Sequence, residues 1–316
     1  MKKSVIIIIS FLLALLLTGC FSEPDYNFGY IDKSGNFVIE PQFDMALPFH
    51  EDMAAVMIGN SLFSRWGYIN LSGEMVIDYE YERARGFYEG LSPVMKDEKW
   101  IFINKQGNKA IDGEFLDASV FNGNMAPVKF PDSNKYGYID INGNTVIKPV
   151  FDIASIFSED LATYGVGTRN PVFGIINRKG EIVAEAKYAY CSAYSERMCV
   201  IKESTNPVAD WGFLNSDGDI VIKPEFAWAS PFNEGLAAVQ IDNSMDGKWG
   251  YINQKGEFVI EPQFSAALNF SEGLAPVKND EGKWGFIDKT GTYIIEPQFS
   301  AAYEFSQGIA PVSLEE

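Results

Sequence analysis

Acidic side chains at one repeated position are the first candidates for chemistry in this sequence. Six glutamates share the same place in segments that resemble one another, so a regular assembly would bring them to one end. Carboxylates gathered there could form a cation-binding rim. Each of them lies beside a predicted tight turn, however, and we favour the interpretation that they are solvated turn residues. The glutamates are Glu51, Glu89, Glu159, Glu196, Glu234 and Glu272.

Two short segments have the alternating oxygen side chains of a calcium-binding loop. One runs from Asp242 to Gly247 and the other from Asn215 to Asp219. Neither is followed at the required distance by the bidentate glutamate of an EF-hand, and the second is also a predicted hairpin turn. We therefore expect no bound metal and no cofactor.

Other catalytic groups are scarce. His50 is the only histidine, which excludes zinc sites built from several imidazoles, and we expect it to be an ordinary surface residue. Cys191 and Cys199 lie where other segments have alanine, so both are predicted to be small core residues, and a disulfide between them stays open. Neither a glycine-rich phosphate loop nor a nucleophile elbow is present. We predict that the protein is not an enzyme, and a hydrolase using paired carboxylates is the alternative.

The overall composition restricts the partners. The chain has 316 residues, of which 47% are hydrophobic and 22% are charged, as in a globular protein. Its formal net charge of −18 repels a nucleic-acid backbone and an anionic membrane surface. We therefore exclude nucleic acid as a partner.

The first twenty residues form a separate segment. Lys2 and Lys3 precede an apolar run over residues 5–17, which is too short to span a bilayer. Leu17-Thr18-Gly19-Cys20 follows directly. The arrangement resembles a bacterial lipoprotein signal, which implies cleavage before Cys20, lipid on Cys20, and anchoring to the membrane outside the cytoplasm. The predicted division is a signal peptide over 1–19, a lipidated linker over 20–27 and a repeat domain over 28–316.

One unit recurs along the rest of the chain. Trp249-Gly250-Tyr251-Ile252 is repeated as Trp284-Gly285-Phe286-Ile287, and weaker copies start at Phe28, Trp66, Trp100, Tyr136, Phe173 and Trp211. Each copy continues into a Val/Ile-rich stretch such as residues 258–262 and ends in a segment such as Glu272 to Val277. The pattern resembles the WG-repeat family of bacterial proteins and implies eight units. The residues assigned to this structural repeat are Trp66, Gly67, Trp100, Trp211, Gly212, Trp249, Gly250, Trp284 and Gly285.

Each unit has the residues of two hairpins. Asn or Asp lies three residues before a Gly in every copy, as in Asp288 and Gly291, which favours a type I turn followed by a left-handed glycine. A second turn precedes each Leu-Ala-Pro-Val-like strand. We therefore predict four short antiparallel strands per unit, the first being the least well defined.

The aromatic strands have no polar face. Trp249 and Tyr251 point to one side and Gly250 and Ile252 to the other, so both sides must be covered. We interpret the repeated tryptophans as packing residues, and a carbohydrate platform is the alternative. Trp228 has no counterpart among the tryptophans of the other units and is the tryptophan that we select for ligand contact.

The chain ends carry complementary halves of a unit. The first unit starts at its third strand, Phe28 to Ile31, and the last ends at its second, Gly308 to Val312. Joining them closes a ring without an open edge. We predict an all-β, propeller-like closed ring of eight meander repeats. The alternative is an open β-solenoid or superhelical array of the same hairpins.

These features predict a lipid-anchored, extracytoplasmic scaffold that binds a protein partner without catalysis. Recognition is expected in irregular loops, because the repeated strands are used for packing. The loops are residues 57–65, 165–172, 202–210 and 240–248. The alternative is capture of a small ligand, cation or glycan by Trp228 and the six glutamates.

Overall fold

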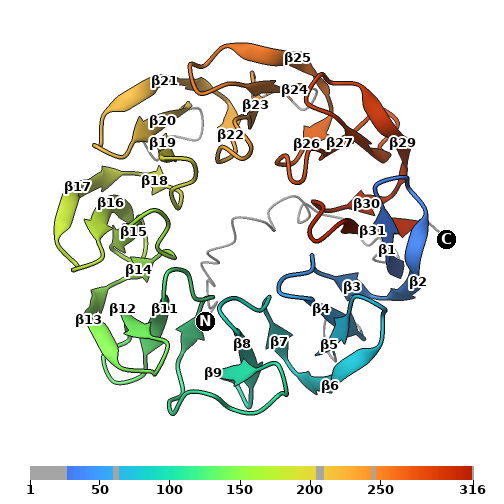
Figure 1. The fold of residues 1–316 in the computed structure, drawn as a ribbon. Coiled ribbons are helices and arrows are strands. Elements are labelled where there is room, and N and C mark those ends of the chain that lie inside the picture. The colour runs from blue at the N-terminus through green and yellow to red at the C-terminus, as the bar shows by residue number, and fades with distance from the viewer. Residues whose placement is uncertain (1–26, 60–63, 204–209, 243, 245–246, 315–316) are drawn as a thin grey trace.

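The computed structural model describes residues 27–59, 64–203, 210–242, 244 and 247–314. These residues form eight antiparallel β-sheets arranged as blades around a central axis, an eight-bladed β-propeller (Figure 1). The predicted all-β closed ring is confirmed, and the open array is excluded. The proposed signal peptide and Cys20 lie outside the described residues.

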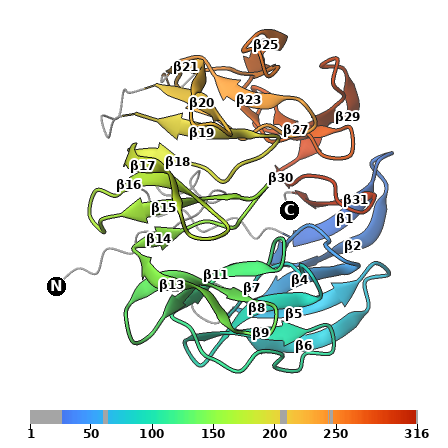
Figure 2. The same ribbon diagram turned by 60° about the vertical axis from the view of Figure 1, so that its left-hand side comes forward.

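In seven of the eight blades the strand order follows the chain from the axis to the rim, and Figure 2 shows the blades as separate short sheets. The two-residue inner strands are β3 (Met45–Ala46), β7 (Arg83–Ala84), β10 (Asp117–Ala118), β14 (Ile153–Ala154), β18 (Tyr190–Cys191), β22 (Trp228–Ala229), β26 (Ala266–Ala267) and β30 (Ala301–Ala302). The second strands are β4 (Met53–Ile58), β8 (Leu91–Lys96), β11 (Met125–Phe130), β15 (Leu161–Val166), β19 (Met198–Lys202), β23 (Ala237–Gln240), β27 (Ala275–Lys278) and β31 (Ile309–Leu314).

The third and outer strands complete each blade. The third strands are β1 (Asn27–Asp32), β5 (Arg65–Asn70), β9 (Lys99–Asn104), β12 (Lys135–Asp140), β16 (Val172–Asn177), β20 (Trp211–Asn215), β24 (Trp249–Ile252) and β28 (Trp284–Ile287). The outer strands are β2 (Phe37–Phe43), β6 (Met75–Tyr81), β13 (Thr145–Phe151), β17 (Ile182–Tyr188), β21 (Ile220–Phe226), β25 (Phe258–Phe264) and β29 (Tyr293–Phe299).

One blade is built from both ends of the chain. Its strand order is β2-β1-β31-β30, and β1 pairs with β31 over six residue pairs from Asn27 with Leu314 to Asp32 with Ile309. Each half alone would leave an unpaired strand edge, so their pairing satisfies the backbone of both. The complementary halves seen in the sequence are therefore the closure of the ring.

The hairpin between the third and outer strands has the predicted turn chemistry. In the last blade Gly291 donates its N–H to the carbonyl of Asp288 at 3.0 Å and adopts a φ of +86°. The Asp288 Oδ1 atom accepts the N–H groups of Thr290 and Thr292. A positive φ of this kind explains why glycine recurs three residues after the Asn or Asp.

The glycine that follows the repeated tryptophan permits a close backbone approach. A Cβ atom on Gly250 would lie 2.5 Å from the carbonyl oxygen of Ile260 in the outer strand of the same blade. The equivalent glycines Gly29, Gly212 and Gly285 have the same restriction. The glycine therefore makes room for its own outer strand.

The blade formed by β7, β8 and β9 departs from the predicted four strands. It has three, and residues 105–116 form no outer strand: they pair with β9 through isolated bridges at Trp100 with Phe115 and Ile103 with Lys109. Ile101 occupies the position of the close-approach glycine in this blade. A side chain there is incompatible with the backbone spacing seen elsewhere, which explains the irregular outer segment.

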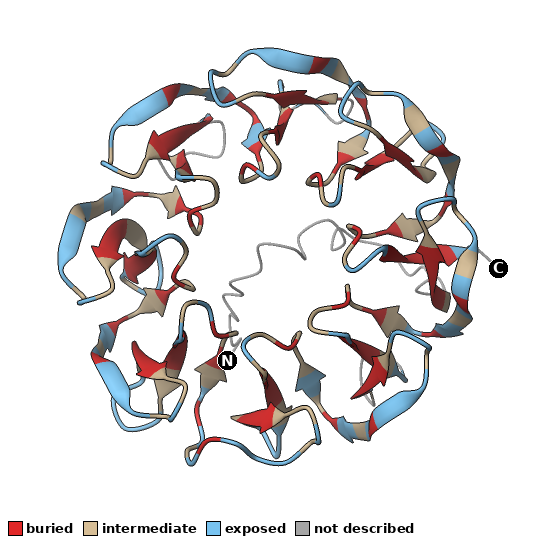
Figure 3. Cartoon of the chain, viewed as in Figure 1, coloured by how far each residue is buried: buried red, intermediate tan, exposed pale blue. Residues whose placement is uncertain are grey.

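The core lies between consecutive blades, and the outer strands present exposed residues at the rim (Figure 3). One cluster joins Tyr251 and Phe264 of one blade to Ala275 and Ile287 of the next. The Tyr251 hydroxyl donates to the carbonyl of Leu268 at 2.8 Å, so its polar end is satisfied. Trp66, Trp100 and Trp211 are buried, while Trp249 and Trp284 are partly buried.

Candidate functional site

The propeller has two distinct faces, which follow from the antiparallel strand directions. We call "turn face" the side with the turns between first and second strands, such as residues 268–273, and between third and outer strands, such as 288–291. We call "loop face" the opposite side, with the loops between second and third strands, such as residues 166–172, and the connections between blades.

The six glutamates lie on the turn face, where each adopts a φ between 50° and 54°. The carboxylates of five of them accept a backbone N–H from the turn of the following blade. Glu234 accepts the N–H of Gly273 at 3.0 Å, and Glu89 accepts that of Asn124 at 2.8 Å. Equivalent bonds join Glu51 to Gly90, Glu196 to Gly235 and Glu272 to Gly308. These inter-blade contacts give the five glutamates a structural role around the ring.

Basic side chains complete several of these contacts, and sequence reasoning missed them. The Lys289 ammonium donates to the carbonyl of Glu234 at 2.9 Å and lies 3.2 Å from its carboxylate. Lys105 and Lys33 make the same pair of contacts with Glu51 and Glu272. The available signal was a basic residue directly after the turn Asp or Asn in these units.

Serines before the glutamates add a second bond between blades. The Ser271 hydroxyl donates to the carbonyl of Phe305 at 2.6 Å, and Ser195 does the same to Phe232. His50 occupies this serine position and is partly buried, with its Nε2 atom 2.8 Å from the Tyr88 hydroxyl of the next blade. Burial lowers the pKa of His50. The histidine therefore belongs to an inter-blade contact.

One inter-blade contact has a different composition. Gly123 occupies the glutamate position of its blade, and Arg178 of the following blade donates to the Gly123 carbonyl at 2.6 Å. The Arg178 guanidinium also bonds Asp160 and lies 5.3 Å from the centre of the Phe157 ring. A Cβ atom on Gly123 would lie 1.9 Å from Arg178, so the glycine and the arginine depend on each other.

Trp228 lies on the loop face at the start of β22 and is 40% exposed. Its ring centre is 4.6 Å from that of Trp211, which in turn lies 4.9 Å from Tyr190. The Lys202 ammonium lies 5.4 Å from the centre of the Trp211 ring. Trp228 and the six glutamates thus lie on opposite faces, so the predicted ligand-binding set is not brought together.

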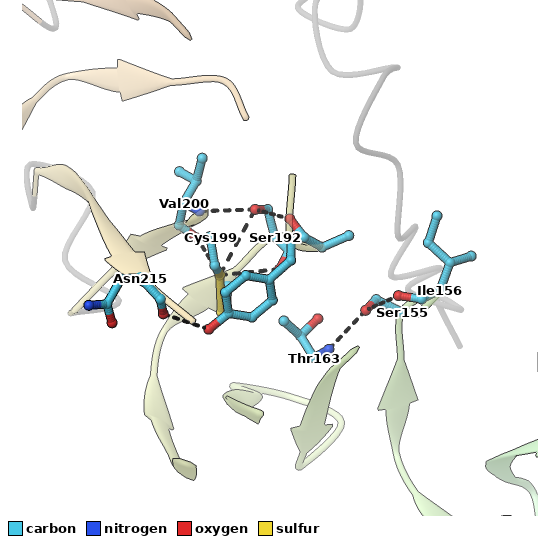
Figure 4. The surroundings of a disulfide bond; sticks show 10 residues. Ser155, Ile156, Thr163, Ser192, Cys199, Val200 and Asn215 are labelled. Carbon is cyan, nitrogen blue, oxygen red and sulfur yellow. Dashed lines mark hydrogen bonds between the residues drawn. A yellow bond between two sulfur atoms is a disulfide. The ribbon is translucent and has the colours of Figure 1, made fainter. Parts of the chain in front are cut away.

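The two cysteines form a disulfide between β18 and β19, with a Cα–Cα distance of 6.4 Å. Figure 4 shows its surroundings, in which the Ser192 hydroxyl accepts the N–H of Val200 at 3.0 Å. Ser155 accepts the N–H of Thr163 in the same way in the preceding blade. The disulfide therefore connects the first and second strands of one blade. The serine hydrogen bond beside it also occurs in the preceding blade, which has no disulfide at this place.

The calcium-like segments have structural contacts of their own. The Asn215 Oδ1 atom accepts the backbone N–H groups of Asp217 and Asp219, as in the other turns. Asp242 accepts the N–H of Ser244, and Asp246 lies outside the described residues. Across the described part of the chain, no three His, Cys, Asp or Glu side chains are grouped to hold a metal.

Another glutamate, Glu304, lies in the turn between β30 and β31 of the blade that closes the ring. Glu304 and Asn269 occupy equivalent positions in neighbouring turns, and the Asn269 backbone N–H bonds to the Glu304 carboxyl. Burial raises the pKa of Glu304 to about 7. The Asn269 Oδ1 atom is buried without a hydrogen-bond partner.

The described residues of the four irregular loops lie on the loop face, between the second and third strands of their blades. Residues 60–63, 204–209, 243 and 245–246 of these loops lie outside the described part of the chain. Exposed apolar side chains mark three of them, Ile58, Val166 and Ile241. In the described residues no helix is both long and apolar enough to cross a membrane.

Comparison with solved structures supports the fold. AztD from Citrobacter koseri is 12% identical with a TM-score of 0.51, and the match covers 92% of this chain and 98% of that one. The β-propeller domain of the Trilobed protease from Pyrococcus furiosus is 8% identical with a TM-score of 0.52, over 80% of this chain and 98% of that one. A eukaryotic initiation factor is 9% identical with a TM-score of 0.53, covering 87% and 81%.

Comparison with curated proteins gives no match. The model of the WG containing repeat matches eight times, and the matches cover most of the chain. They span residues 28–61, 66–100, 102–130, 136–167, 173–203, 211–244, 249–284 and 284–316. With its repeated turns, close-approach glycines and inter-blade contacts, the chain belongs to the WG containing repeat family.

Proposed function

We propose that this protein is a lipid-anchored, non-catalytic scaffold that binds a protein partner outside the cytoplasm. One observation carries the proposal: the described residues of the four irregular loops lie on a single face of the propeller. Repeat proteins commonly place insertions on their binding face, since loops can vary without disturbing the packed strands.

The remaining surfaces support this assignment, because many of their side chains are already used in contacts between blades. The glutamates and lysines of the turn face bond to neighbouring blades. Aromatic side chains such as Tyr251 and Phe270 fill the space between blades. The loop face is the surface whose sequence differs most from blade to blade, as a specific recognition surface requires.

The anchor rests on the sequence alone. Lys2, Lys3, the apolar run over residues 5–17 and Cys20 support lipidation. Replacing Cys20→Ser should release the chain from the membrane fraction, and mass spectrometry of the mature wild-type chain should find acyl groups on Cys20. A wild-type chain that retains residues 1–19 and carries no lipid would contradict the anchor.

Site-specific photo-crosslinking in producing cells tests the recognition surface. A photoreactive amino acid at Val166 or Ile241 should yield an adduct of one defined size, because both are exposed on the loop face. Leu71 on the turn face and Val259 on the rim are matched controls of similar exposure. Replacing residues 167–171 by the two-residue turn of Asp97 and Glu98, with the photoreactive residue kept at position 166, should abolish the adduct from Val166. Adducts confined to Leu71 or Val259 would overturn the proposal.

A second candidate is capture of a small ligand or glycan at Trp228. Its support is the exposed Trp228 ring beside Trp211, since exposed aromatic rings bind sugars and cations. Tryptophan fluorescence during titration with a glycan panel should change in the wild type and not in Trp228→Ala. Glu-to-Gln changes at the six glutamates test a cation rim, and hydrolysis assays over glycans and peptides test the enzyme alternative.

A further inference from the structure

The turns between first and second strands bring one equivalent residue of each blade close to the axis. It is the second residue after the first strand, as Glu304 is after Ala302, and Figure 3 shows these turns as the innermost part of the ring. Two neighbouring blades have Asn269 and Glu304 at this position, and the other six have an apolar residue or glycine. The six are Pro48, Gly86, Val120, Ile156, Ala193 and Pro231.

A side chain at this position is directed toward the turn of the preceding blade. The Glu304 carboxyl accepts the backbone N–H of Asn269, which is the equivalent residue of the blade before. A Cβ atom on Gly86 would lie 3.0 Å from the ring of His50, again in the turn of the blade before. By the same relation, Asn269 faces the turn that contains Pro231.

The Asn269 side chain lacks a donor in this arrangement. Among the residues that the structure describes, its buried Oδ1 atom has no hydrogen-bond partner. Proline has no N–H group, so Pro231 cannot supply the bond that Asn269 supplies to Glu304. A buried acceptor without a partner is costly, and it indicates a donor that the chain itself does not provide.

The Glu304 carboxyl beside it also has free acceptor sites. A carboxylate has about four lone-pair sites, and the N–H groups of Asn269 and of Glu304 itself use two of them. Burial raises the pKa of Glu304 to about 7 against the effect of these two donors, and no lysine or arginine of the described chain adds to that effect. The two turns therefore present acceptors and an acidic group without a cationic partner.

We propose that the turns of these two blades bind the ammonium group of a small organic amine at the axis. The ammonium donates one hydrogen bond to the Asn269 Oδ1 atom and one to the Glu304 carboxylate, whose charge balances its own. The site uses neither the loop face nor the six glutamates at the repeated position. It therefore goes beyond the proposed scaffold function and does not depend on it.

A primary ammonium suits these two acceptors better than a metal ion does. It carries three N–H donors and a single charge, whereas calcium takes about six to eight oxygen ligands. The described residues contain no group of three acidic, histidine or cysteine side chains that could hold a metal. The equivalent positions on either side are Pro231 and Pro48, which provide apolar contacts for the carbon chain of an amine.

Chemical-shift changes on the full mature chain, labelled with ¹⁵N and purified in a non-ionic detergent, test the site. The probe is butylammonium at about pH 8, where the amine and the Glu304 carboxyl are both mostly charged. We expect saturable shifts of the Asn269 and Glu304 amide signals. The amide signals of Gly86 and Val120, at the same position in apolar turns, are the matched controls and should not move.

A neutral probe and a metal probe separate the alternatives without any variant. Butan-1-ol has the same carbon chain without the charge and should leave the Asn269 and Glu304 signals unchanged. Equal shifts with butan-1-ol, or no saturable shift with butylammonium, would overturn the proposal. Shifts with calcium chloride and none with butylammonium would identify a metal site instead.

Variants then measure what each side chain contributes to binding. Glu304→Gln keeps the size of the side chain and should weaken butylammonium binding about tenfold or more, and Asn269→Leu should weaken it about threefold or more. Glu296→Gln removes the same charge from the exposed rim and should change the affinity less than about twofold. Equal weakening by Glu296→Gln and Glu304→Gln would mean that the whole acidic molecule attracts the cation, which contradicts a defined site. The unshifted signals of the other blades report whether each variant keeps the fold.

Discussion

The three-stranded blade of β7, β8 and β9 and the four-stranded blade of β26 to β29 use the same chain length in different ways. Lys105 to Phe115 corresponds to Lys289 to Phe299 residue by residue. Ile111 and Ile295 are 2% and 3% exposed, and Phe115 and Phe299 are also buried. Both segments therefore keep their core residues, although only the second forms an outer strand.

The difference shows that burial and backbone pairing have separate requirements. Core contacts need only Ile and Phe at fixed places. Outer-strand pairing also needs glycine in the third strand, where Ile101 stands in one blade and Gly285 in the other. It further needs a β-forming segment such as Tyr293 to Ile295, which Lys109 to Ile111 does not match.

The largest expected effect comes from making the regular blade resemble the irregular one. Gly285→Ile would place a Cβ atom 2.6 Å from the carbonyl oxygen of Ile295, so the outer strand must move. We expect a loss of about 3 kcal/mol or more in the free energy of unfolding, measured by urea denaturation. Ile101→Val is the control and should cost about 1 kcal/mol. Equal losses in the two variants would contradict the role of the glycine.

The inter-blade contacts test whether the irregular blade is otherwise normal. Glu51 and Glu234 make the same contacts, the first with Gly90 and Lys105 of the irregular blade and the second with Gly273 and Lys289 of the regular one. Each Glu→Ala change should lower stability by a similar amount, about 1–2 kcal/mol, while each Lys→Met change should cost less than about 1 kcal/mol. Thermal unfolding at low and high salt would check this. A much smaller loss for Glu51 would show that the defect extends to the turn face.

Rebuilding the irregular blade should give a smaller gain. A chimera with Ile101→Gly and residues 289–299 in place of 105–115 should form a fourth strand and gain about 1 kcal/mol. Hydrogen exchange should show new protected amides within the replaced segment. Ile101→Gly alone should not protect this segment, because its residues stay unchanged, and protection in that variant would contradict the second requirement.

The smallest effect concerns pH. Backbone and side-chain hydrogen bonds from Thr290 and Thr292 lower the pKa of Asp288, while the irregular blade has the non-titrating Asn104 at this place. The folded pKa lies below the unfolded value of 3.8, so the contribution is complete above that value and is lost as the pH falls through the folded pKa. Asp288→Asn should therefore flatten the decline of stability below about pH 4. An unchanged decline would show that other acids determine it.

Much of the fold could be predicted from the sequence because its signals are local and repeated. The spacing of Asp288 and Gly291 indicates a hairpin in every unit, and the half-units at Phe28 and Val312 indicate closure. The missing outer strand was harder to foresee. It depends on a backbone approach between Gly250 and Ile260, or their equivalents, which only the paired register reveals.

The candidate site was harder to predict from the sequence, because its contacts also depend on how strands and blades are paired in space. The repeat pattern of the sequence predicts that Glu234 lies beside a turn. Its contacts with Gly273 and Lys289 depend on how neighbouring blades are arranged, which the sequence of one unit does not reveal. The disulfide of Cys191 and Cys199 likewise depends on the spacing between two adjacent strands. The six glutamates and Trp228 were grouped by residue type, and the structure separates them between the two faces.

The shared blade also affects how the molecule folds. β1 and β2 are made first, yet their sheet is complete only when β30 and β31 have been synthesised at the other end of the chain. Contacts this distant in sequence form slowly, and until then the edge of β1 is open to strands of another copy. Refolding at high concentration therefore favours dimers that exchange their terminal strands, while dilution favours the monomeric ring.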